Sequence, residues 1–166
     1  MNTIQRFTTA YSKPEDRFLL HVIMEADEVQ SLMLTQRLLL SLLPRLFKWI
    51  EELDGDDLRG ELTRGFKQQA ARRNQEKRPP VEVTEDALQY LVTSIKVRTK
   101  KQGVRLVFEF DQDQKAALAL SLKGLRQWLN ILCDTWKRAG WAMEVWPDWV
   151  SESHNAAGKS AKRAVH

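Results

Sequence analysis

The chain has few of the residues that most often carry chemistry. It contains one cysteine, Cys133, and three histidines in 166 residues. A lone cysteine cannot form an intrachain disulfide, and no two histidines have the spacing of metal ligands. His21 lies inside a predicted strand, and the neighbouring carboxylate of Asp134 disfavours a reactive thiolate at Cys133. We therefore expect no enzyme activity, no catalytic residue, no metal site and no cofactor.

Long apolar runs are also missing. The longest, Leu38 to Leu43, is interrupted by Ser41 and followed by Pro44. A membrane-spanning helix needs roughly 18 or more apolar residues, so we expect no membrane contact. The first residues from Met1 onward do not resemble a signal segment. Together with the lack of disulfides, this predicts a cytoplasmic protein.

Neither sign of charge dominates strongly. The chain has 26 lysines and arginines against 22 aspartates and glutamates, a net charge of +4. This excess permits an anionic partner without requiring one. A hydrophobic fraction of 43% and a charged fraction of 29% are typical of a globular protein. The chain is also long enough to bury a core without disulfides.

A pattern that occurs twice is the most informative feature of the sequence. Three short segments that alternate between apolar and polar residues are followed by an amphipathic helix, first up to about Leu53 and again up to about Trp141. The segment before the first helix aligns with the segment before the second, and Leu39 and Leu43 then align with Leu125 and Leu129. The sequence thus indicates an internal repeat.

This repeat predicts the fold class and the division of the chain. We predict an α+β protein with two repeated three-strand-plus-helix (βββα) halves, residues 1–54 and 85–150, whose antiparallel sheets pack on helices. A charged, partly helical connector, residues 55–84, joins the halves. Few apolar residues follow Val150, so we expect residues 151–166 to form a disordered basic tail.

The first predicted helix, about Gln36 to Leu53, is apolar around an unusually wide arc. A surface helix needs only one apolar stripe about 100° wide, so some apolar side chains are left over. We assign these to a protein interface formed by Leu40, Phe47, Trp49 and Ile50. The resulting prediction is a non-catalytic interaction or assembly protein, an adaptor or scaffold, that forms a homodimer or binds another protein.

Two basic segments support an alternative function. The second predicted hairpin and the connector carry the cations Lys96, Arg98, Lys100, Lys101, Arg105, Arg64, Lys67, Arg72 and Arg73. If both segments shared one face, they would form a groove for the backbone of single-stranded nucleic acid. The outward positions of the hairpin carry no aromatic rings on which bases could stack. Nucleic-acid binding is therefore the alternative to protein interaction.

Three of the six tryptophans, Trp141, Trp146 and Trp149, follow the last predicted helix. Large exposed aromatic side chains are costly in a monomer, which favours a segment that packs back on the core. An exposed contact for a partner is the alternative, because tryptophan is enriched at interface hot spots.

Overall fold

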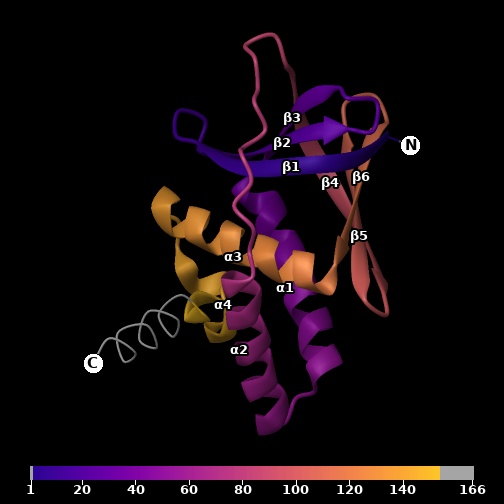
Figure 1. The fold of residues 1–166 in the computed structure, drawn as a ribbon. Helices are drawn as coiled ribbons and strands as arrows, with labels where there is room; N and C mark the ends of the chain where they lie inside the picture. The colour runs from indigo at the N-terminus through magenta and orange to yellow at the C-terminus, as the bar shows by residue number, and fades with distance from the viewer. Residues whose placement is uncertain (1, 154–166) are drawn as a thin grey trace. The chain divides into compact units, whose positions relative to one another are not determined.

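The computed structural model describes residues 2–153, and these residues confirm the α+β class (Figure 1). They form six strands, four α-helices and a short 3₁₀ helix. The chain divides into two compact units. Among the described residues, the barrel unit comprises 2–42 and 77–122, and the helical unit comprises 43–76 and 123–153. Each unit takes residues from both predicted halves, and the internal repeat stays a prediction.

The barrel unit is built on a closed six-stranded barrel. Its strands are β1 (Asn2–Ser12), β2 (Arg17–Met24), β3 (Val29–Leu34), β4 (Leu88–Lys100), β5 (Gly103–Phe110) and β6 (Gln114–Ser121). Pairing is antiparallel from β1 to β3 and from β4 to β6, but β3 pairs with β4 and β1 with β6 in parallel. These parallel junctions correct the prediction of separate antiparallel sheets. Alternation of apolar and polar residues along a strand indicates which face of the strand is buried. It does not indicate which strand pairs with it.

A register shift in β4 changes which of its side chains are buried. The shift lies between Val92 and Ser94, opposite Phe110 and Glu109 of β5. Val92 and Ile95 are both buried, whereas Leu91 and Thr93, which strict alternation would place on the same face as Ile95, are exposed. An extra residue on one strand reverses the facing of the residues after it.

Two polar contacts fix further parts of the barrel unit. His21 Nδ1 on β2 and Ser31 Oγ on β3 share a hydrogen bond of 2.7 Å, and burial lowers the pKa of His21. The segment before β4 is held along β1, because the Val81 amide donates to Thr8 Oγ1 at 3.1 Å. His21 therefore has a structural contact within the sheet.

The helical unit packs its helices around a core of large side chains. It contains α1 (Gln36–Asp54) from residue 43, α2 (Leu58–Arg73), α3 (Leu122–Ala139) from residue 123, the 3₁₀ helix η1 (Met143–Val145) and α4 (Asp148–Ser151). Its core includes Leu43, Leu46, Phe47, Ile50, Leu125, Trp128, Leu129, Leu132, Trp136, Trp146 and Val150. In residues 2–153, no helix combines the length and apolar character needed to span a bilayer.

The tryptophan-rich segment packs back on this core, as predicted. Trp141 and Trp146 are 8% and 5% exposed, and their ring centroids lie 4.8 Å and 5.7 Å from that of Trp136. Ser153 is also buried and donates to the Val150 carbonyl at 2.7 Å. Residues 151–153 therefore belong to the helical unit and not to a tail. Residues 154–166 of the predicted tail lie outside the described residues.

Candidate protein-interaction groove

The structure corrects two of the four predicted interface residues. Phe47 and Ile50 are 6% and 0% exposed within the single chain, so neither presents a surface to a partner. The ring of Phe47 packs against Trp146, with centroids 5.5 Å apart. This cover comes from a segment distant in sequence, which helical periodicity cannot reveal. Trp49 is half-buried, and Leu40 is 42% exposed on the part of α1 that belongs to the barrel unit.

The largest exposed apolar side chains of the helical unit lie instead on α2. Leu58, Leu62 and Phe66 are 71%, 56% and 65% exposed. Residues four apart share one face of a helix, so the three form a row, which we call the α2 row. Contiguous exposed apolar surface is a mark of protein-interaction sites. The four-residue spacing in an otherwise polar connector is the sequence signal for this row.

The start of α2 is fixed by local backbone chemistry. Asp57 caps the helix, its Oδ1 accepting from the Gly60 amide at 2.8 Å. A Cβ at Gly60 would lie 2.1 Å from the carbonyl oxygen of Gly55, which has a φ of +92°. Arg64 then donates to the carbonyls of Glu51 and Gly55 at 3.4 Å and 3.0 Å, satisfying the end of α1. Arg64 is 5% exposed, which corrects its prediction as a nucleic-acid contact.

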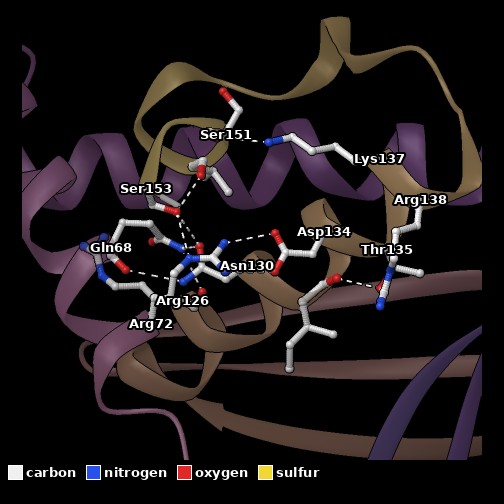
Figure 2. Close-up of polar contacts among 12 residues, drawn as sticks. Gln68, Arg72, Arg126, Asn130, Asp134, Thr135, Lys137, Arg138, Ser151 and Ser153 are labelled. Atoms are coloured by element: carbon white, nitrogen blue, oxygen red, sulfur yellow. Dashed lines mark hydrogen bonds and ion pairs between the residues drawn. The ribbon is translucent and has the colours of Figure 1, made fainter. Parts of the chain in front are cut away.

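A buried polar network attaches α2 to α3 and α4 (Figure 2). Gln68 Nε2 donates to Asn130 Oδ1 at 2.9 Å and to the Arg126 carbonyl at 2.8 Å. Ser153 Oγ lies 3.1 Å from the same Asn130 oxygen. Gln68 and Asn130 are both fully buried. Because unsatisfied buried polar groups are costly, this network fixes one rotation of α2 and keeps the α2 row outward.

Two other connector cations predicted to bind nucleic acid form ion pairs inside the helical unit. Lys67 Nζ lies 3.0 Å from Asp54 Oδ1. Arg72 forms two hydrogen bonds with Asp134, of 2.8 Å and 3.1 Å (Figure 2). Arg73 is exposed. Lys67 and Arg72 are therefore paired with neighbouring carboxylates.

A groove of about 480 Å³ lies beside the α2 row, between α2 and α4. Its lining residues are Glu51, Glu61, Leu62, Arg64, Gly65, Phe66, Gln69, Asp148, Trp149, Glu152 and Ser153. The Trp149 ring stands edge-on to Phe47, with centroids 5.8 Å apart, and its Nε1 donates to Glu51 Oε1 at 3.3 Å. The half-buried Trp149 thus lines the same groove as Leu62 and Phe66.

The charge of this groove is strongly one-sided. Among the described residues, its lining carries four carboxylates, from Glu51, Glu61, Asp148 and Glu152, and one cation, Arg64. The Arg64 guanidinium is directed to backbone carbonyls by the contacts described above. The groove therefore combines apolar walls with a negative rim, an arrangement suited to a ligand that is both apolar and cationic.

The basic hairpin of the barrel unit is partly neutralised by an acid on its own sheet. Lys96 Nζ lies 2.9 Å from Glu109 Oε1, and Lys115 Nζ lies 3.8 Å from the same atom. The hydrogen bond from Lys96 holds the pKa of Glu109 below its usual range. Glu109 comes from β5 and lies outside the acid-free run of residues 96–105. The sequence therefore did not reveal this pairing.

The other hairpin cations lie closer together. Arg98 on β4 is directly opposite Arg105 on β5, and Lys100 and Lys101 are exposed at the turn. A hollow of about 550 Å³ is lined by Lys100 and Arg105 together with residues of β5 and β6.

The single cysteine of the chain, Cys133, is buried. Burial raises the pKa of the Cys133 thiol to about 11, and the side chain is 1% exposed. Across residues 2–153, no three histidine, cysteine or acidic side chains are grouped so that they could hold a metal ion. The groove and the basic hairpin are thus the two surfaces from which a function can be argued.

Comparisons with known proteins assign no family to this chain. No protein-family model, curated protein or solved structure matches it. Any functional assignment therefore depends on the geometry of these two surfaces.

Proposed function

We propose that the chain is a non-catalytic protein-interaction module, an adaptor or scaffold, whose contact surface is the α2 row with the adjoining groove. The exposure of Leu58, Leu62 and Phe66, at 71%, 56% and 65%, is the observation that carries the proposal. Full burial of such a side chain stabilises a complex by roughly 1.5 to 3 kcal/mol. Covering this row therefore supplies a substantial driving force for association.

The charge of the groove favours a different protein over a second copy as the partner. In a twofold dimer the same surface is used by both subunits. Such a dimer across the groove would bring two rims of Glu61, Asp148 and Glu152 together, and like charges at an interface oppose binding. Self-association, which the sequence predicted through the first helix, becomes an outcome of the test below.

Photo-crosslinking in the native host tests this function. We expect benzoylphenylalanine at position 66 to give a heavier crosslinked species, and the same group at the exposed Lys48 to give none. Adding Leu62→Asp should abolish the species, because it places a charge in the α2 row. A crosslink that survives Leu62→Asp, or none at position 66, would reject the proposal. A product of twice the chain mass would identify a second copy.

A second candidate function is binding of single-stranded nucleic acid by the basic hairpin. The exposed cations Arg98, Lys100 and Lys101 favour it, since they can pair with the phosphates of a nucleic-acid backbone. Filter binding over a salt series decides this candidate. We expect affinity that falls with salt and is lost in the double variant Arg98→Glu with Lys100→Glu. Unchanged binding in that variant, or no binding at low salt, removes this candidate.

A further inference from the structure

We infer that the groove between α2 and α4 binds a basic amphipathic helix of a partner protein. This inference rests on the proposed function and specifies the chemistry of the partner. The occupant places apolar side chains against Leu62, Phe66 and Trp149 and cationic side chains against the acidic rim.

The charges of the lining determine the sign of the partner. Glu61, Asp148 and Glu152 are all exposed at the groove, whereas Arg64 is 5% exposed and bonded to backbone carbonyls. A cationic side chain that enters gains several attractive contacts, while an anionic one meets repulsion on both walls. Lysine or arginine on the bound segment is therefore the complement of this site.

The spacing of the α2 row indicates that the bound partner segment is a helix. Leu58 and Phe66 are eight residues apart, which corresponds to about 12 Å along a helix axis. A helix that binds in a groove uses apolar residues at positions i, i+3 or i+4, and i+7, which repeat over a similar length. Two turns of an amphipathic helix would therefore cover Leu58, Leu62 and Phe66 together.

Gly65 allows a partner to approach α2 closely. It lies within α2, and a Cβ built there has nothing within 4 Å among its neighbours. Glycine inside a helix costs roughly 1 kcal/mol relative to alanine, so a residue with free space around it would normally not be glycine. Gly65 lines the groove beside Leu62 and Phe66. Its missing side chain lets the backbone of a bound helix pack directly on α2.

Fluorescence anisotropy with a defined probe tests the inference. The probe is a labelled peptide of about 15 residues, leucine on one helical face and lysine on the other. We expect the full chain to bind it, with affinity that falls as salt rises. Phe66→Ser should weaken binding at least about tenfold, and Glu61→Gln with Glu152→Gln should weaken it about threefold to tenfold. Glu52→Gln, an exposed neighbour outside the lining, is the matched control and should bind normally.

Gly65→Ala separates binding from folding. Its Cβ meets no atom of the chain, so the variant should fold normally, but it should bind the probe more weakly because the added methyl group lies in the groove. A peptide with glutamate in place of lysine should not bind. Equal binding of the two peptides, or normal binding by both Phe66→Ser and Gly65→Ala, would overturn the inference.

Two further outcomes would assign the groove to another occupant. Tighter probe binding after Lys159, Lys162 and Arg163 are changed to alanine would identify the chain's own C-terminal segment as a competitor, against the inference. A dimer in sedimentation that Phe66→Ser dissociates would identify a second copy, also against it. If position 66 crosslinks in the host but the probe does not bind, the proposed function stands and only the basic helix is rejected.

Discussion

Arg126 Nη2 lies 3.0 Å from Asp54 Oδ2, and the two side chains are only 3% and 1% exposed. Asp54 ends α1 and Arg126 lies on α3, while Lys67 of α2 reaches the other oxygen of Asp54 at 3.0 Å. Burial acts to raise the pKa of Asp54, but hydrogen bonds from Lys67 and Arg126 outweigh it and hold that pKa below its usual range. One carboxylate therefore joins the three helices that support the groove.

Removing this carboxylate should strongly destabilise the helical unit. Asp54→Asn leaves Arg126 buried without its counter-ion, and loss of one partner of a buried ion pair typically costs about 3 to 5 kcal/mol. The free energy of unfolding in urea measures the effect. Glu52→Gln, two residues earlier and exposed, should change it by less than about 0.5 kcal/mol. Similar losses in both variants would contradict the role given to Asp54.

The same carboxylate predicts a pH dependence. Because the pKa of Asp54 is lower in the folded chain than its ordinary value of about 4, its stabilisation is complete at neutral pH. Below pH 4 the unfolded chain binds a proton first, so this stabilisation is lost as pH falls through the folded pKa. Unfolding in urea from pH 7 to pH 3 should therefore show a steeper loss for wild type than for Asp54→Asn. Parallel curves would argue against this ion pair.

Replacing two glycines of α2 by alanine should change the free energy of unfolding in opposite directions. Gly65→Ala should raise the free energy of unfolding by roughly 0.5 to 1 kcal/mol, because helix propensity improves and the Cβ meets nothing. Gly60→Ala should lower it, because the new Cβ would lie 2.1 Å from the Gly55 carbonyl oxygen. Thermal melts of both variants measure this difference. A loss of stability in Gly65→Ala would mean that the space beside that residue is filled.

Cys133 should be unreactive in the folded chain. The thiol is buried and its pKa is raised to about 11, so both access and thiolate formation are suppressed at pH 8. Alkylation by iodoacetamide, followed by mass spectrometry, should proceed quickly in urea and slowly without it. Equal rates in the two conditions would show that α3 opens readily or that the thiol is exposed.

Local structure was largely predictable because side-chain periodicity reports it directly. The first helix was predicted from about Gln36 to Leu53, and α1 spans Gln36–Asp54. Closure of the barrel was not predictable, because β4 and β6, the parallel neighbours of β3 and β1, lie far from them in sequence. The register shift after Val92 was also missed, since one extra residue leaves no distinctive composition.

The candidate site was harder to predict because burial depends on tertiary contacts. Phe47 was assigned to an interface, yet it packs against Trp146 and Trp149 within the same unit. Arg64 was assigned to a basic surface, yet it satisfies the carbonyls at the end of α1. Phe66 is spaced four residues from Leu62 in the sequence, but its 65% exposure follows only from the folded structure.

Chemical-shift mapping of the ¹⁵N-labelled chain is the most direct test of the α2–α4 surface as a binding site. Titration with the leucine–lysine peptide should shift amides of residues 58–69 and 148–153, and leave those of the β4–β5 hairpin unchanged. Shifts confined to the hairpin, or no shifts on α2, would contradict the account.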